Sequence, residues 1–156
     1  MSGNKGVGKL RPVNSADLDR LVELDFKNTG HKRQGFYAKR LQASVNSSEA
    51  FISLGIEADG KLAGFVLAHI LDGEFGGNDP VAVLDALGVD PDLKGKGLAR
   101  ALMSGLDEHL KLHKVREVRT QADWSEIDLI RFFASAGFSL APTRVLERAP
   151  THNPEF

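Results

Sequence analysis

Residues 81–106 read VAVLDALGVDPDLKGKGLARALMSGL and contain the clearest strand-to-helix pattern in the chain. The first part is an apolar run with several β-branched residues, and Asp90 and Pro91 interrupt it, which predicts a central strand that ends in a turn. Apolar side chains then recur at three- and four-residue steps, at Leu98, Ala101, Leu102, Met103, Leu106 and Leu110. This spacing predicts a helix with one apolar face from about residue 97 onward.

The loop between this strand and this helix has the composition of an anion-binding site. It reads Lys94-Gly95-Lys96-Gly97-Leu98-Ala99, and its small residues let a ligand approach the main chain. The first N–H groups of a helix have no partner within it and carry the positive end of its dipole, and Lys94, Lys96 and Arg100 add charge. A phosphate or pyrophosphate fits this pattern. An ordinary turn with solvated lysines fits it equally well, so the loop alone leaves both interpretations open.

The stretch VDPDLKGKGLARALM resembles the acyl-CoA-binding motif of the GNAT N-acetyltransferase superfamily. That motif reads Arg/Gln-x-x-Gly-x-Gly/Ala after a strand ending in Val-x-Pro, and the matching positions here are Val89, Pro91, Lys94, Gly97 and Ala99. Lys94 stands where Arg or Gln is usual, which keeps a charge but not the geometry of a guanidinium or an amide. The resemblance implies that main-chain groups of Leu87 and Val89 hold the pantetheine arm. It also implies that the CoA pyrophosphate lies on the loop formed by Lys94, Gly95, Lys96, Gly97, Leu98, Ala99 and Arg100.

A second stretch, WSEIDLIRFFASAGF at residues 124–138, resembles another GNAT motif, whose Gly-Phe ending is Gly137-Phe138 here. Phe133 takes the position of a tyrosine that, in many members, lies near the coenzyme sulfur and protonates the leaving thiolate. The resemblance therefore implies a place for Phe133 beside the cofactor. Phenylalanine has no proton to donate, so another group or water protonates the thiolate, or it leaves unassisted.

The resemblance implies an α/β protein with the GNAT acyltransferase fold, a mixed and mostly antiparallel sheet with splayed central strands and flanking helices. One such domain is expected at residues 10–148, between a flexible N-terminus at residues 1–9 and a C-terminal tail at residues 149–156. The implied activity is transfer of an acetyl group from acetyl-CoA to a primary amine, by direct attack in a ternary complex. The alternative is a domain of the same fold that binds acyl-CoA as a sensor or regulatory subunit without turnover.

Direct attack requires removal of a proton from the amine, and Asp85 is the strongest candidate for the base. Strand alternation predicts that its side chain shares a face with those of Leu87 and Val89. A carboxylate in an apolar strand is costly unless it is paired or used, so a purely structural hydrogen bond of Asp85 is the open alternative. By resemblance to the family, the Val89 N–H is expected to donate to the thioester oxygen. Weaker base candidates are Glu74, Asp123 and Tyr37.

The flanking segments predict the remaining elements. A helix is expected from a cap at Asn14 or Ser15 to about residue 28, and strands at 50–57 and 62–71 are expected to form a hairpin turning at Asp59-Gly60. Residues 30–48 have aromatic side chains at helical spacing, either as an inward-packing surface helix or as a border of the acceptor site. The acidic loop at 72–80 is either solvated or attracts a cationic amine. A short strand is expected at 117–121 and closing strands at Phe138, Leu140 and 145–146.

Composition excludes several classes of function. The 156 residues carry a net charge of −1, which argues against a general nucleic-acid binder, and the absence of cysteine excludes disulfides and an acyl-cysteine intermediate. His109 and His113 have a spacing that can hold a metal, but no third ligand is implied, so a solvated helix face is expected and no metal site is predicted. With no membrane-spanning run and no visible signal peptide, we expect a cytoplasmic protein. Its expected partner is an amine-bearing small molecule or protein, and homodimers are frequent in the family.

Overall fold

The computed structural model describes residues 8–73 and 77–150 of the chain, which divides into two compact units, residues 1–121 and 122–156. Each unit is described by itself. Most of the predicted flexible N-terminus therefore lies outside the described residues, and Lys9 already belongs to a strand. In order, the first unit contains β1 (Lys9–Pro12), η1 (Ser15–Asp17), α1 (Leu18–Thr29), α2 (Gln34–Asn46), β2 (Phe51–Ala58), β3 (Lys61–Asp72), β4 (Pro80–Val89), η3 (Pro91–Leu93), α3 (Leu98–Leu112) and β5 (Glu117–Thr120).

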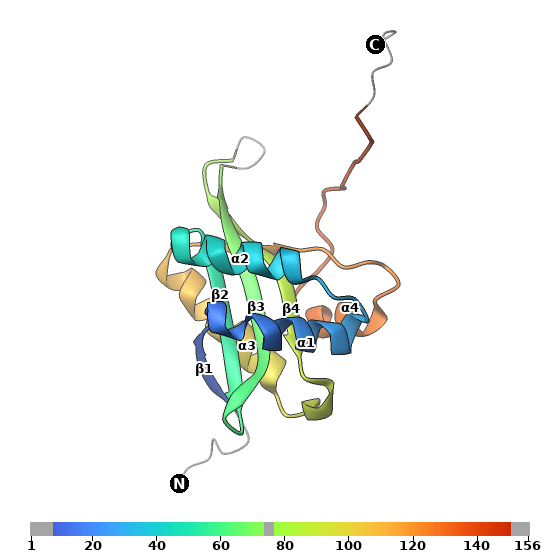
Figure 1. Ribbon diagram of the computed structural model, residues 1–156. Coiled ribbons are helices and arrows are strands. Elements are labelled where there is room, and N and C mark those ends of the chain that lie inside the picture. Colours follow the sequence, from blue (N-terminus) through green and yellow to red (C-terminus); the bar gives the residue numbers. More distant parts are fainter. Residues whose placement is uncertain (1–7, 74–76, 151–156) are drawn as a thin grey trace. The chain divides into compact units, whose positions relative to one another are not determined.

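The sheet of the first unit has the order β1-β2-β3-β4-β5. Neighbouring strands from β1 to β4 are antiparallel, whereas β5 pairs parallel to β4 after the crossover through α3. Helices α1 and α2 cover one face of this sheet and α3 covers the other (Figure 1). The prediction of a mixed and mostly antiparallel sheet flanked by helices is confirmed.

The hairpin of β2 and β3 turns where the sequence predicted it. Asp59 and Gly60 both have positive φ, 54° and 81°, and lie between the paired residues Ala58 and Lys61. Asp-Gly with two positive φ angles suits the two-residue turn whose twist matches that of the flanking strands.

The core beneath α1 and α2 is built from apolar side chains of both helices and of the central strands. Tyr37 and Phe65 are fully buried and meet edge to face, with ring centroids 5.6 Å apart. Gly88 of β4 lies against Phe65, because a Cβ at position 88 would come within 2.8 Å of that ring. The other buried members of this core are Val13, Leu21, Leu24, Leu41, Leu62, Leu67 and Ala86.

The second unit contains α4 (Ile127–Ser135), which ends before Gly137 at a φ of 95°. The rings of Phe132 and Phe138 both lie against Phe133, at centroid distances of 5.8 and 5.1 Å. The predicted closing strands at residues 138–146 are absent from the described residues, so that prediction is wrong. Leu140, Val145 and Leu146 are 72–100% exposed. Their apolar spacing alone does not make a strand, because a strand needs a partner for its N–H and C=O groups.

Candidate active site

The loop between β4 and α3 presents an open backbone. Gly95 and Gly97 have φ values of 81° and 76°, a left-handed conformation that favours glycine, and no atom lies within 4 Å of a Cβ built on either residue. Gly97 is the N-cap of α3 and provides no side-chain hydrogen bond to the helix. The first N–H groups of α3 are thus left for an anionic ligand, which is the arrangement that binds phosphate in many proteins.

Three cations surround this loop. Lys94, Lys96 and Arg100 are exposed, and within the described residues none of them makes a side-chain hydrogen bond or an ion pair. Their charges are therefore not neutralised by the described part of the protein. Leu98, by contrast, is 3% exposed and points into the core, so it fixes the start of α3. The loop combines an anchored helix start with free positive charge.

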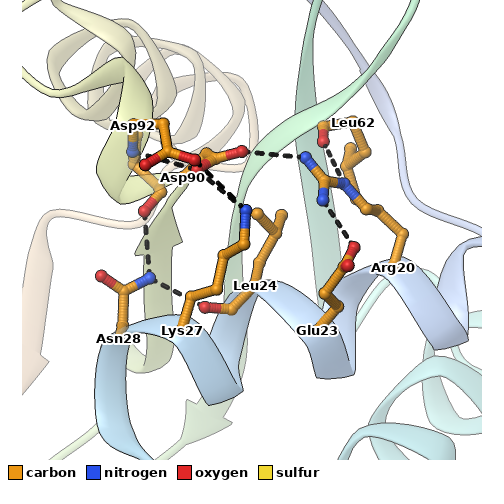
Figure 2. Close-up of polar contacts among 9 residues, drawn as sticks. Arg20, Glu23, Leu24, Lys27, Asn28, Leu62, Asp90 and Asp92 are labelled. Carbon is orange, nitrogen blue, oxygen red and sulfur yellow. Dashed lines mark hydrogen bonds and ion pairs between the residues drawn. The ribbon is translucent and has the colours of Figure 1, made fainter.

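Asp90 fixes the junction between β4 and this loop (Figure 2). Its side chain is buried, 5% exposed, and accepts a hydrogen bond from the Asp92 N–H at 3.0 Å. From α1, Arg20 Nη2 lies 3.0 Å and Lys27 Nζ 3.5 Å from its two oxygens. Arg20 Nε also donates to the Leu62 carbonyl at 2.8 Å. The side chain of the residue that follows β4 thus ties α1, β3 and the loop together.

The pKa of Asp90 is lower than the ordinary carboxyl value. Burial alone would raise this pKa, because it disfavours the charged form. The hydrogen bond from the Asp92 N–H and the charges of Arg20 and Lys27 outweigh that effect. Asp90 is therefore a stable anion that holds two α1 cations in place. The sequence offered one signal for this role, an Asp followed by Pro at a helix-type turn, which is a typical N-cap.

The outer edge of β4 beyond residue 84 has no partner strand among the described residues. Pairing with β5 runs from Val81 only to Leu84, whereas β4 continues to Val89. The Asp90 N–H donates toward β3, to the Ala63 carbonyl at 2.8 Å. Because N–H and C=O point in opposite directions across a trans peptide, the Val89 carbonyl points away from β3. Strand alternation then directs the N–H groups of Leu87 and Val89 to this open edge.

Asn28 of α1 occupies part of the same edge. Its side-chain amide donates to the Val89 carbonyl at 3.0 Å and to the Leu24 carbonyl at 2.9 Å (Figure 2). The Val89 carbonyl is thus a satisfied acceptor at this edge. In the part of the chain that the structure describes, no strand pairs with the N–H groups of Leu87 and Val89 there. No local sequence pattern predicts this contact, because residues 28 and 89 come together only in the folded chain.

Asp85 is the extra residue of a β-bulge. In the pairing of β3 with β4, Leu67 faces Ala86 and the next residue, Ala68, faces Leu84, which leaves Asp85 without a partner. Bulges occur often beside active sites, where they redirect a side chain. Ala86 and Gly88 both face the core beneath α1 and α2. The bulge turns Asp85 to that same face, so the predicted sharing of a face with Leu87 and Val89 is wrong.

Asp85 is paired with a histidine that the sequence analysis did not identify. His69 Nδ1 lies 2.7 Å from Asp85 Oδ2, and the two side chains are 18% and 11% exposed. If the carboxylate is the acceptor, Nδ1–H is the donor, and in the neutral imidazole with this tautomer Nε2 carries the free lone pair. This is the arrangement of a histidine base that a carboxylate orients. The available signal was a single titratable residue within the apolar strand at 62–71.

Arg40 and Phe51 complete the surroundings of the pair. Arg40 Nη2 of α2 lies 3.5 Å from Asp85 Oδ1, and the Phe51 ring of β2 stacks on the His69 ring at 5.8 Å. Arg40 also lies over the Phe51 ring at 5.7 Å. Side chains from α2, β2, β3 and β4 therefore meet here, and their mutual contacts hold the His69 ring in place.

Distances along β4 limit which groups can act together. At about 3.3 Å per residue, Asp85 is about 7 Å from Leu87 and about 13 Å from Val89 along the strand. The Val89 N–H is therefore the open-edge donor farther from the His69–Asp85 pair. The Leu87 N–H is the open-edge donor nearer to the pair.

The weaker base candidates were Tyr37, Asp123 and Glu74. Tyr37 is fully buried and accepts a hydrogen bond from Arg33 Nη2 at 3.2 Å, and burial raises its pKa far above the ordinary value. It is a core residue and not a base. Asp123 accepts a hydrogen bond from the Ser125 N–H at 3.3 Å in the second unit. Glu74 lies outside the described residues. Phe133 belongs to the second unit, so its place beside a cofactor stays a prediction.

The two helix histidines do not form a metal site in the described residues. The His109 and His113 rings stack at 4.3 Å, and no group of three residues able to hold a metal occurs in 8–73 and 77–150. His109 is not simply solvated, however, because its Nε2 is buried without a hydrogen-bond partner there. Burial, and the neighbouring His113, lower the pKa of His109. In the same part of the chain, each helix is too short or too polar to cross a membrane.

One family model matches most of the chain. The model of the Acetyltransferase (GNAT) family matches residues 16–138. This range covers the bulged strand, the loop at residues 94–97 and the helix that carries Phe133. It is well over half of the chain.

Individual relatives and structures are more distant. The mycothiol acetyltransferase of Acidothermus cellulolyticus is 30% identical over 156 residues, which cover 90% of this chain and 47% of the relative. The ribosomal protein bS18-alanine N-acetyltransferase of Escherichia coli K12 is 28% identical over 99 residues, 64% of this chain and 62% of the relative. The chain spans about half the length of the first. A solved aminoglycoside N-acetyltransferase, AAC(6')-Iy in complex with CoA, has the same fold, with a TM-score of 0.76 and 18% identity over 92% of this chain and 95% of that chain.

Proposed function

The chain belongs to the GNAT acetyltransferase family, and from this premise we propose that it transfers an acetyl group from acetyl-CoA to a primary amine. The observation that carries the proposal is the hydrogen bond of 2.7 Å between His69 Nδ1 and Asp85 Oδ2, beside the open edge of β4. A domain that only binds acyl-CoA has no need of an oriented base. This observation favours the enzyme over the sensor alternative.

Acetyl-CoA fits the residues on the cofactor side. Its pyrophosphate would lie on the N–H groups of the loop Lys94–Ala99 and of Arg100, within reach of the three exposed cations. Its amide-containing arm would accept from the free N–H groups of Leu87 and Val89 along the open edge. Bound there, acetyl-CoA supplies a thioester carbonyl for attack and a thiol as the leaving group.

His69 is the proposed base, and Asp85 is its positioning residue. The attacking amine must be neutral, and His69 Nε2 accepts its proton as the N–C bond forms and the C–S bond breaks. Asp85 holds the tautomer with the proton on Nδ1 and stabilises the charge that His69 gains. This refines the sequence-based expectation of Asp85 as the base. Asp85 retains a part in the reaction, but it acts through His69.

Leu87 is the better donor to the thioester oxygen. Its N–H lies on the open edge about 7 Å along the strand from Asp85, against about 13 Å for Val89. A donor and a base that act on one carbonyl must converge within a few ångströms. We therefore assign the oxygen contact to the Leu87 N–H and a contact with the pantetheine arm to the Val89 N–H. Phe133 would pack against the arm and provides no proton to the leaving sulfur.

The proposal is tested by release of free thiol from acetyl-CoA in the presence of primary amines. Turnover that depends on the amine, with acetylated amine as the second product, supports the enzyme. Tight binding of acetyl-CoA without release for any amine of a broad panel would support the sensor instead.

The relatives' names suggest two kinds of acceptor, a small molecule and a protein amine. We also propose that the protein acts in the cytoplasm without a nucleic-acid or membrane partner, and as a homodimer. Sedimentation and microscopy of the tagged chain would check these points.

A further inference from the structure

A pocket of about 290 Å³ is lined by residues of α2 and β2. Helix α2 lines it with Phe36, Lys39, Arg40 and Ala43, and β2 lines it with Phe51. Two of these residues also touch the pair, since Arg40 lies 3.5 Å from Asp85 and Phe51 stacks on His69. The pocket thus adjoins the proposed base through shared walls, and its lining has two aromatic rings and two cations.

Arg40 is held with its charge facing this pocket. Its guanidinium carbon lies 5.4 Å from the Phe36 ring centroid and 5.7 Å from that of Phe51. Such flanking by rings orients a guanidinium and leaves its planar N–H fork for a ligand. Its contact with Asp85, at 3.5 Å, is longer than a normal charged hydrogen bond. Lys39 makes no ion pair within the described residues.

We propose that this pocket binds a carboxylate of the acceptor, and that the acceptor is a primary amine carrying a carboxylate beside an apolar group. The carboxylate pairs with Arg40 and Lys39, the apolar group lies against Phe36 and Phe51, and the amine reaches His69. This inference rests on the proposed function and names its substrate class. A free apolar amino acid and a short peptide with an acidic residue both have this chemistry.

Size and charge support the same class. Pockets for drug-sized ligands have volumes of roughly 300–1,000 Å³, so the space here suits a molecule of amino-acid size. The ionisable groups that line it among the described residues are Lys39 and Arg40, both cationic. The neighbouring carboxylate of Asp85 is already engaged by His69 and Arg40. A polycationic amine such as an aminoglycoside would meet like charge in this pocket.

A binding experiment tests the pocket without relying on turnover. The CoA-saturated protein is titrated with N-acetyl-L-phenylalanine and with N-acetyl-L-phenylalaninamide, which differ only in the carboxylate. We expect the acid to bind about ten- to hundredfold more tightly than the amide, the range for one charge-assisted contact. The Arg40→Gln variant should lose this preference, Arg40→Lys should keep part of it, and the exposed Lys111→Gln should keep all of it. Equal binding of acid and amide, or no binding of either at millimolar concentration, would overturn the inference.

Turnover measurements distinguish a free amino acid from a peptide as the carboxylate-bearing acceptor. They also distinguish failure of this inference from failure of the proposed function. L-Phenylalanine and an acidic dipeptide are compared with L-phenylalaninamide and with kanamycin as acceptors. Preference for either carboxylate-bearing amine supports the inference and identifies the source. The amine of L-phenylalaninamide is less basic than that of L-phenylalanine, so more of it is neutral at pH 7. By reactivity alone the amide would be the better acceptor, and a preference for the acid therefore reports recognition of the carboxylate. Preference for kanamycin or the amide would overturn the inference and leave the proposed acetyltransferase intact, whereas loss of CoA binding would overturn the proposed function.

Discussion

The proposed cofactor side and the proposed acceptor side of this site are built in opposite ways. The cofactor side is continuous in the chain, from Leu87 through the loop to Arg100. The acceptor side brings together Arg40 of α2, Phe51 of β2, His69 of β3 and Asp85 of β4. In the proposed function the first would bind the cofactor through backbone N–H groups and helix geometry, and the second would act through side chains. A family can therefore keep the first in a short motif while the second varies with the substrate.

The largest expected effect separates catalysis from cofactor binding. Replacing His69 with Gln, or Asp85 with Asn, should reduce turnover about hundredfold to ten-thousandfold, because a base or its orientation is lost. The affinity for acetyl-CoA should stay within about twofold of the original, since neither residue lies on the loop. Exogenous imidazole should partly restore turnover to His69→Ala.

The matched control for this prediction is His31→Gln, an exposed histidine between α1 and α2. It should turn over like the original protein. If His69→Gln also retained full turnover, His69 would not be the base. The assignment of catalysis to the acceptor side would then be wrong.

The next effect concerns the cofactor side alone. Gly97→Val places a β-branched residue at a φ of 76° where the backbone must approach the ligand. We expect the affinity for acetyl-CoA to fall about ten- to hundredfold by calorimetry. Gly60→Val is the matched control, because Gly60 has a φ of 81° and equally open surroundings in the β2–β3 turn. Equal losses in both variants would attribute the effect to general strain and not to the loop.

A smaller effect, on stability, is expected at Asp90, which supports the loop between β4 and α3. Asp90→Asn removes the charge that holds Arg20 and Lys27, and should lower the free energy of unfolding at pH 7 by about 1–3 kcal/mol. The pKa of Asp90 is lowered in the folded protein, so its contribution is present above its ordinary value of 3.8 and is lost as the pH falls below it. Denaturant unfolding should show the two proteins converging below about pH 4. Asp92→Asn, an exposed neighbour, should change stability little at any pH. Parallel curves for Asp90→Asn and the original protein would contradict this account.

The smallest effect lies far from both sides of the site. The pKa of His109 is lowered by burial and by His113, so the unfolded state takes up this proton first as the pH falls below 6.5. His109→Leu should therefore reduce the loss of stability between pH 7 and pH 5, by less than about 1 kcal/mol. Thermal unfolding at several pH values measures this loss. If stability fell equally with pH in His109→Leu and in the original protein, His109 would not contribute to the pH dependence.

The features that the sequence predicted correctly lie mainly on the cofactor side, and those that it missed lie mainly on the acceptor side. Gly95 and Gly97, the turn at Asp59-Gly60 and the helix from residue 98 are local features, and their patterns predicted them correctly. The mostly antiparallel sheet followed from the strand patterns and the family resemblance. The two glycines, the turn and the helix depend on residues that are neighbours in the chain.

The acceptor side was beyond such patterns for physical reasons. Strand alternation placed Asp85 on the wrong face, because a bulge adds one residue and its position depends on the pairing with β3. His69 was overlooked because its partner is 16 residues away in sequence. The predicted closing strands failed because apolar spacing around Leu140 and Val145 says nothing about whether a partner strand is present.

The most direct test of the account is calorimetric titration of the original protein, Gly97→Val and His69→Gln with acetyl-CoA and CoA, with NADH and ATP as controls. The account predicts selective binding of both CoA species in the micromolar range by the original protein. Binding should be weakened in Gly97→Val and unchanged in His69→Gln, which nevertheless loses turnover. Failure of the original protein to bind either CoA species, or equal binding of NADH and ATP, would contradict the assignment of the loop and the proposed function with it.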